Sequence, residues 1–373
     1  MKIPDWPVAT EREFELLREV LESPQWGGFH DMVERLEREF AAFQHCRHGV
    51  SCVNGTVAIE MALEAAGIGP GDEVIVPAIS FISTATAVNW VGATPVFVDI
   101  EPYSFNMDPE RAAAAVSPKT KAIIAVHFGG PLADMDRLAA LCGERGLALI
   151  EDAAHAHGSE WNGRRAGSLG LAGTFSFQNS KVMTAGEGGM LTTNDDGIAE
   201  RARAYANQGR REGAGWFHHY TLGTNYRITA LQAAVLLAQL ERLPEQIRLR
   251  MRNAELLREE LSGVVGLTFQ HVPPQVNVNS YYLLLGRIDA ARFGMTRDEF
   301  HREITSLGVP CTAFYPHPLY GNPIYRSIPC RVEPCLVAEA CIQDAFWFPH
   351  RVLMGDEETT REIAAAVRKL RRA

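Results

Sequence analysis

Apolar residues recur at helical spacing in two segments near the start of the chain. Between residues 10 and 22 the repeat includes Phe14, Leu17 and Leu21, and a similar repeat runs through residues 31–45. A period near 3.6 residues is typical of an amphipathic helix with one apolar stripe. We therefore expect two surface helices before residue 46.

From about residue 50 to residue 195 the pattern changes to short apolar runs that alternate with amphipathic segments. The expected strands are Glu73–Val76, Thr94–Ile100, Lys121–Phe128, Leu147–Ala153, Gly173–Phe177 and Gly189–Thr193. The expected helices lie at 56–66, 82–91, 109–116, 133–145 and 196–206. This alternation predicts an α/β fold with a mostly parallel sheet flanked by helices. Ligands of such sheets bind beyond the carboxyl ends of the strands.

A long helical segment rich in Leu, Arg and Glu follows, from Thr229 to about Ser262, with an expected interruption at Pro244. After Pro273-Pro274 a second α/β region continues to the end of the chain. We expect a large domain over residues 1–250 and a smaller C-terminal α/β domain over 251–373. A length of 373 residues is in keeping with two domains.

Composition and charge narrow the class of protein. The net charge of −9 argues against a nucleic-acid partner, because that affinity depends on cations that neutralise phosphates. No run of 18 apolar residues occurs, so no membrane span is expected. The N-terminus lacks a signal-peptide core and the seven cysteines form no CxxC pair. We expect a cytoplasmic protein with reduced thiols.

The first segment that carries chemistry is Asn54-Gly55-Thr56, directly before a helical pattern. Small polar residues at a helix start can present N–H groups to an anion, most usefully a phosphate. The same residues can also do no more than cap the helix, and this segment alone favours a cap.

Acids and histidines follow the apolar run that ends at Ile150, namely Glu151, Asp152, His155 and His157. A carboxylate at the end of a strand, beside a ligand crevice, can pair with a cationic ring nitrogen. Two histidines suggest a metal, but the sequence places no third ligand, so we expect a structural His157 and no metal site.

A single lysine, Lys181, follows the expected strand 173–177 and precedes the glycine-rich run Gly186-Glu-Gly-Gly189. A lysine beside apolar neighbours is poorly solvated as a cation, so its amine becomes a usable nucleophile. The glycines let the backbone bend close to a flat ligand. An exposed lysine near a hairpin is an equal alternative for this segment alone.

These three segments, in this order and together with Gly223-Thr-Asn225-Tyr-Arg227, resemble the DegT/DnrJ/EryC1/StrS family of sugar and cyclitol aminotransferases. The resemblance covers nearly the whole chain from Trp26. It implies the pyridoxal phosphate-dependent transferase fold type I, with a mostly parallel seven-stranded sheet in the large domain. The implied cofactor, pyridoxal 5′-phosphate, needs a Schiff-base lysine, an acid on its pyridinium nitrogen and a phosphate site.

The resemblance also implies a role for each matching residue. Lys181 is the catalytic Schiff-base lysine and proton shuttle, and Asp152 keeps the pyridine nitrogen protonated. The other cofactor-binding candidates are Gly55, Thr56 and Ser176 at the phosphate, Phe81 over the ring, His155 at the phenolic edge and Asn225. Asn225 reaches the phosphate from the neighbouring subunit, which implies a homodimer with shared active sites. For Trp216–Tyr220, interface packing and substrate contact stay equal alternatives.

The substrate-binding candidates are Tyr315, His317 and His350. The segment Phe314–Tyr320 resembles the family's small-domain loop over the substrate. Aromatic and histidine side chains suit a polyhydroxylated ring, since they offer apolar faces and hydrogen bonds.

We therefore expect an aminotransferase that moves an amino group from glutamine or glutamate to a keto-sugar or keto-cyclitol, through pyridoxamine phosphate, in secondary-metabolite biosynthesis. The residues around Lys181 resemble members that act on free carbocycles, including aminohydroxybenzoate synthases, and nucleotide-linked keto-sugars stay open. An aromatising dehydratase with the same cofactor is the main alternative, and a non-catalytic regulator that keeps the pocket is another. A nicotinamide dehydrogenase is disfavoured, because the glycines at 67–71 follow a helix and precede a strand.

Overall fold

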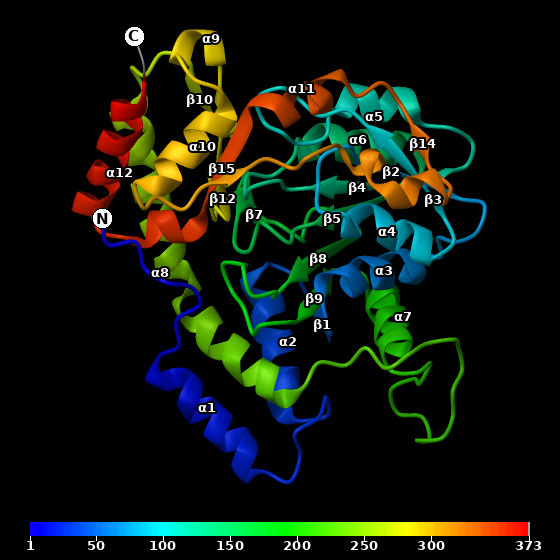
Figure 1. Cartoon of the computed structure of the whole chain (residues 1–373). Helices are drawn as coiled ribbons and strands as arrows, with labels where there is room; N and C mark the ends of the chain where they lie inside the picture. Colours follow the sequence, from blue (N-terminus) through cyan, green and yellow to red (C-terminus); the bar gives the residue numbers. More distant parts are fainter. Residues whose placement is uncertain (372–373) are drawn as a thin grey trace.

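The main sheet of the protein has eight strands, seen in a computed structural model that describes residues 1–371 (Figure 1). Their order is β1-β9-β8-β5-β4-β2-β3-β14. The strands are β1 His48–Cys52, β2 Glu73–Pro77, β3 Thr94–Val98, β4 Thr120–Val126, β5 Ala148–Asp152, β8 Ala172–Ser176, β9 Gly189–Thr193 and β14 Arg331–Val332. Only β9 runs antiparallel to its neighbours, which confirms the mostly parallel α/β sheet. An eighth strand arises because β14, from the C-terminal region, pairs with β3.

Alternating side chains of the strands face two separate apolar cores, as the pleat of a β-strand requires. Ile75 and Ile123 lie in one core, whereas Val74 and Ile124 lie in the other. The first core is covered by α2 Asp31–Phe43, α5 Pro109–Ala115, α6 Met135–Arg145 and the first half of α8 Ala230–Leu261. The second core is covered by α3 Gly55–Ala65, α4 Ser83–Trp90 and α7 Asp196–Ala206.

Helix α8 is one continuous helix of 32 residues with Pro244 inside it, so the expected interruption is wrong. A proline removes one backbone hydrogen bond and usually bends a helix, but packing along both halves can hold the helix together. The first half of α8 packs on α1 Glu11–Glu22 and α2, and the second half packs on α12 Glu357–Leu370.

The C-terminal region forms a smaller domain with its own sheet in the order β10-β12-β15-β13. Its elements are β10 Leu267–Phe269, β12 Leu283–Ile288, β13 Thr312–Ala313, β15 Ala345–Pro349, α9 Ala290–Phe293, α10 Arg297–Ser306 and α12. Ala254 and Leu257 of α8 belong to the core of this domain, whereas Ile247 belongs to a core of the large domain. A boundary at residue 250 stays a prediction.

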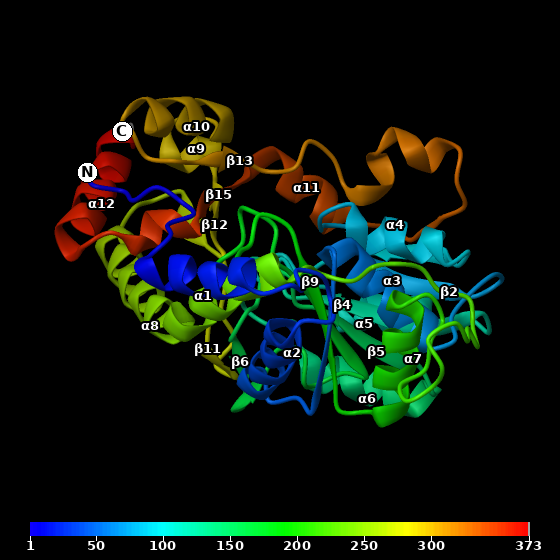
Figure 2. The same cartoon turned by 90° about the horizontal axis from the view of Figure 1, so that it is seen from below.

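The N-terminal end of the chain lies beside α12 (Figure 2). The Met1 amine pairs with Glu362 at 2.8 Å, and Ile3 packs on the core of the smaller domain. The remaining elements are β6 Glu160–Trp161, β7 Arg164–Arg165, β11 Val276–Val278, α11 Leu336–Asp344, η1 Leu319–Gly321, η2 Pro323–Arg326 and η3 His350–Met354. Across residues 1–371, no helix is both long enough and apolar enough to span a membrane.

Candidate active site at the carboxyl ends of the strands

The first turn of α3 lies directly against the end of β8. Asn54 caps the helix, since its Oδ1 accepts a hydrogen bond from the Val57 N–H at 2.9 Å. A Cβ atom at Gly55 would lie 2.7 Å from the Cβ of Ser176, so only glycine allows this approach. The N–H groups of the first turn have no carbonyl partner within the helix. The helix cap is therefore confirmed, and the Thr56 hydroxyl of the same turn lies 2.7 Å from Ser83 Oγ. A phosphate site at this turn, which we call the phosphate cup, stays a prediction.

The last glycine of the run after Lys181 allows β9 to pack closely against the residue that precedes α3. A Cβ atom at Gly189 would lie 2.2 Å from the backbone oxygen of Asn54. The Gly189 contact shows that the backbone of β9 approaches the start of α3. The expected approach of these glycines to a flat ligand stays a prediction.

Asp152 is the last residue of β5 and is held as a hydrogen-bond acceptor. Its Oδ2 accepts the hydroxyl of Thr84 at 2.7 Å, and its Oδ1 accepts the N–H of Ala154 at 3.2 Å. The Thr84 hydroxyl in turn contacts Ser80 Oγ at 2.7 Å. The start of α4 thus fixes the carboxylate that ends β5.

His155 follows β5 and is buried. The Gly129 N–H donates to its Nδ1 at 3.3 Å, so Nε2 is the nitrogen that carries the hydrogen in the neutral ring. Burial, followed by the charge of Lys181, lowers the pKa of His155 well below its usual value. The ring is therefore a neutral N–H donor at physiological pH.

Lys181 lies beside Tyr282, a residue that our sequence analysis missed. The Lys181 Nζ is 4.4 Å from the centre of the Tyr282 ring, and that ring is 4.3 Å from the His155 ring. Tyr282 comes from the chain just before β12, about 100 residues further on. No local motif around Tyr282 signals this contact.

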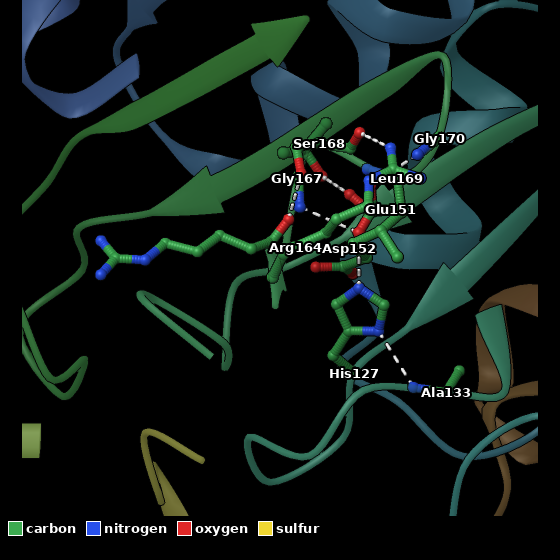
Figure 3. A network of polar contacts seen from close by, with 12 residues as sticks. His127, Ala133, Glu151, Asp152, Arg164, Gly167, Ser168, Leu169 and Gly170 are labelled. Atoms are coloured by element: carbon green, nitrogen blue, oxygen red, sulfur yellow. Dashed lines mark hydrogen bonds and ion pairs between the residues drawn. The ribbon is translucent and has the colours of Figure 1, made fainter. Parts of the chain in front are cut away.

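A buried carboxylate next to Asp152 organises the same end of the sheet (Figure 3). Glu151 accepts hydrogen bonds from the N–H groups of Gly167, Leu169 and Gly170 at 2.7–2.8 Å. His127 Nε2 lies 2.9 Å from Glu151 and donates to it, because the His127 Nδ1 accepts the N–H of Ala133. Sequence analysis assigned no role to Glu151.

His157, which we expected to be structural, is fully buried, and its Nε2 lies 3.0 Å from the carbonyl oxygen of Ser176. Within residues 1–371 no group of three or more His, Cys, Asp or Glu side chains is arranged to hold a metal ion.

The aromatic candidates differ in their surroundings. Phe81 is 58% exposed in the turn between β2 and α4. Burial, followed by the charges of Tyr282 and Asp152, raises the pKa of Tyr315. Tyr315 also packs on Trp347 with ring centroids 5.3 Å apart.

The two remaining histidine candidates have different surroundings. His317 Nδ1 is 3.1 Å from the oxygen of the next residue, Pro318, and no contact with Lys181 or Asp152 is found in the described chain. His350 is buried, and its Nε2 lies 3.2 Å from the carbonyl oxygen of Ser180. His350 thus contacts the backbone of residues 177–188, the segment between β8 and β9 that we call the Lys181 loop.

Asn225 is exposed on a long segment after α7 that extends away from the sheet (Figure 1). We call residues 207–228 the arm. An isolated bridge between Asn207 and Asn225 closes its base. The arm exposes Trp216, Phe217, Tyr220 and Leu222.

Comparison with known proteins agrees with this geometry. The family model described as the DegT/DnrJ/EryC1/StrS aminotransferase family matches residues 7–368. The chain is 38% identical to 3-amino-5-hydroxybenzoate synthase of Amycolatopsis mediterranei, covering 98% of this chain and 97% of that protein. It is 36% identical to L-glutamine:2-deoxy-scyllo-inosose aminotransferase of Streptoalloteichus tenebrarius, covering 99% and 94%.

Solved structures show the same similarity in three dimensions. The crystal structure of 3-amino-5-hydroxybenzoic acid synthase superposes with a TM-score of 0.93 at 37% identity, covering 99% of this chain and 98% of that chain. These matches extend over both the large sheet and the smaller domain. The chain is therefore a member of the DegT/DnrJ/EryC1/StrS aminotransferase family, whose enzymes depend on pyridoxal 5′-phosphate.

Proposed function

We propose that this protein transfers an amino group from glutamine or glutamate to a keto-cyclitol or keto-sugar. One observation carries the proposal. Lys181 and His155 share contact with Tyr282 at the end of the sheet that holds Asp152 and the α3 turn, in a chain similar to aminocyclitol aminotransferases. The cluster matches what pyridoxal phosphate chemistry requires.

The residues present fit that cofactor. The close approach of Ser176 to Gly55 places the Ser176 side chain beside the first turn of α3, whose backbone N–H groups can bind a phosphate. Phe81 is exposed enough to lie over a flat ring, and Asp152 presents a carboxylate. When bound, the cofactor supplies an electron sink for a substrate carbanion.

Each side chain then has a distinct task. The Lys181 amine holds the cofactor and afterwards moves a proton to or from the substrate carbon. The Asp152 carboxylate, fixed by Thr84, keeps a proton on the ring nitrogen. The neutral His155, whose Nε2 carries the hydrogen, would donate it to an oxygen of the bound cofactor.

A second set of side chains suits a carbocyclic or sugar acceptor. Phe128, Phe314 and Trp347 pack around Tyr315. Flat apolar faces and one hydroxyl group suit a hydroxylated ring. We propose a free carbocycle as the acceptor, in secondary-metabolite biosynthesis. We keep His317 and His350 as candidate substrate-binding residues.

A second candidate function is an aromatising dehydratase. It is favoured by the similarity to 3-amino-5-hydroxybenzoate synthase, at 38% identity and with a TM-score of 0.93 for the solved structure. The same aromatic cluster around Tyr315 suits a planar product. Both functions use Lys181.

We also propose a homodimer that shares its two active sites. Four large apolar side chains on the arm are exposed, with Phe217 at 85% and Leu222 at 93%. Apolar clusters of this kind mark protein interfaces. A second copy of the chain covering the arm brings Asn225 to the neighbour's phosphate cup.

Spectroscopy and product analysis test the proposal. Purified protein with pyridoxal 5′-phosphate is expected to absorb visible light, and borohydride is expected to leave the cofactor's mass on the Lys181 peptide. Lys181→Ala is expected to lose both signals. Mass spectrometry of reactions with glutamine and keto-cyclitols then separates amine transfer from transfer with loss of water. A colourless wild-type protein that ignores added cofactor contradicts both functions.

A further inference from the structure

Four aromatic rings form a continuous column beside the Lys181 loop. The His155 and Tyr282 ring centroids are 4.3 Å apart, those of Tyr282 and His350 are 6.2 Å apart, and those of His350 and Trp6 are 4.6 Å apart. The rings come from the turn after β5, the start of β12, the start of η3 and the N-terminal segment. We call these four residues the ring column.

The ring column contacts the backbone of the Lys181 loop at two consecutive carbonyl groups. Trp6 Nε1 donates to the carbonyl oxygen of Lys181 at 3.0 Å. His350 Nε2 lies 3.2 Å from the carbonyl oxygen of Ser180, where it donates its hydrogen. The N-terminal segment and the start of η3 therefore hold the peptide on either side of the Lys181 Cα.

The third ring contacts the side chains of the same two residues. The Tyr282 hydroxyl lies 2.8 Å from Ser180 Oγ. The face of the Tyr282 ring lies 4.4 Å from the Lys181 Nζ, a geometry that attracts an ammonium group. Tyr282 thus fixes the amine, while its hydroxyl fixes the orientation of the ring.

We propose that the ring column is the device that positions the Lys181 amine, with Tyr282 as its central positioning residue. The proposal rests on the proposed function, in which Lys181 is the reacting amine. When that amine is not bonded to the cofactor, the Tyr282 ring keeps it beside His155 instead of leaving it mobile. Three of the four rings come from outside the large sheet, so the docking of the N-terminal segment and of the smaller domain also determines where the amine lies.

Acylation of Lys181 in cofactor-free protein tests this without any turnover. A neutral acylating reagent is applied at one fixed pH, and the rate is read from the mass of the Lys181 peptide. Tyr282→Leu removes the ring, and we expect a rise in the rate of about threefold or more, because the ammonium loses its partner. Tyr282→Phe keeps the ring and loses only the Ser180 contact, so its rise is expected to be smaller.

Two further variants complete the design. Trp6→Phe removes the bond to the Lys181 carbonyl at a half-buried surface position, and it is expected to raise the rate even if Tyr282→Leu fails to fold. Tyr103→Leu makes the same chemical change at an exposed tyrosine away from the column and is expected to label like wild type. Circular dichroism establishes that each variant is folded.

The loaded enzyme gives a second readout. Tyr282→Leu is expected to lower kcat about tenfold with little change in KM for the keto acceptor, because a misplaced amine affects the chemical step. Wild-type labelling in folded Tyr282→Leu and Trp6→Phe overturns the proposal, as does a rise in Tyr282→Phe equal to that in Tyr282→Leu. Since labelling needs no cofactor or substrate, a failure here is distinct from a failure of the aminotransferase proposal.

Discussion

The role that we propose for Asp152 depends on a carboxyl group that Thr84 and Ala154 hold in place. Asp152→Asn keeps the shape of the side chain and can still accept the Thr84 hydroxyl, but it cannot hold a proton on the ring nitrogen by charge. We expect kcat to fall about a hundredfold or more, with a nearly unchanged melting temperature. Steady-state kinetics at saturating cofactor measure this change.

Thr84→Val is the matched control for the Asp152 variant. It removes one hydrogen bond to the carboxylate and leaves the charge. Its effect on kcat is expected to be about tenfold, in line with the loss of one bond to a charged group. An Asp152→Asn enzyme with wild-type kcat contradicts the assigned role.

His157 makes stability depend on pH. Burial, followed by the charge of Lys181, lowers the pKa of His157 from 6.5 to about 3. Below pH 6.5 the unfolded chain takes up a proton at this residue while the folded chain does not, so the unfolding free energy falls as the pH falls towards 3. Each pH unit in that window costs about 1.4 kcal/mol.

Removing this histidine is expected to remove its share of the acid sensitivity. Between pH 6.5 and pH 5, His157→Gln is expected to lose about 2 kcal/mol less stability than wild type. Urea unfolding of the cofactor-free protein at the two pH values measures the difference. His271→Gln, at an exposed position, is expected to behave like wild type.

Residues that act through local motifs could be predicted from the sequence, and residues that act through distant contacts could not. Asn54-Gly55-Thr56 and the run from Glu151 to Gly158 each form a local unit of a helix start or a strand end. Tyr282 acquires its role only when the chain returns about 100 residues later to the Lys181 loop. The periodicity and spacing of residues within one segment cannot predict such a contact.

At the scale of elements, Glu151 joins the end of β5 to the turn at residues 167–170. Its carboxylate accepts four hydrogen bonds, three of them from backbone N–H groups (Figure 3). In Glu151→Gln one oxygen becomes an NH₂ group that faces donors. We expect the unfolding free energy to fall by about 3 kcal/mol, since several bonds to a buried charge are lost.

Urea denaturation of Glu151→Gln, with Glu160→Gln as the control, measures this effect. Glu160 pairs with Arg165 at 3.1 Å in a half-buried position, so its neutralisation is expected to cost under about 1 kcal/mol. An equal loss of unfolding free energy in the two variants would contradict a stabilising role for the hydrogen bonds around Glu151.

The elements that the sequence analysis did not foresee share a physical cause. β1, with the sequence His-Gly-Val-Ser-Cys, is short and polar at one end, and it becomes a strand through its pairing with β9. β14 has two residues and depends wholly on β3. In α8, packing on α1, α2 and α12 overrides the local effect of Pro244. Tertiary contact decides each of these cases.

At the scale of the whole molecule, the arm connects α3, at whose start we propose the phosphate cup, to the exposed surface. The hydroxyl groups of Tyr205 and Tyr226 bind Glu60 of α3 at 2.6 and 3.2 Å. The base of the arm is therefore fixed to the helix that starts at the cup, while Asn225 and the exposed aromatic side chains face outward. A cup in one subunit and an arm from the other would then form one site, as twofold symmetry allows.

Mixed dimers test this arrangement, because Lys181 and Asn225 would serve a common site only when they belong to different chains. Lys181→Ala and Asn225→Ala proteins are each expected to have low activity at limiting cofactor. After mixing and subunit exchange in equal amounts, half of the dimers carry both chains, and each of these contains one site with both wild-type residues. Activity is then expected to rise to about one quarter of wild type. If Asn225 instead acts on the cup of its own chain, every site lacks one of the two residues and mixing restores nothing, even where light scattering establishes that mixed dimers form.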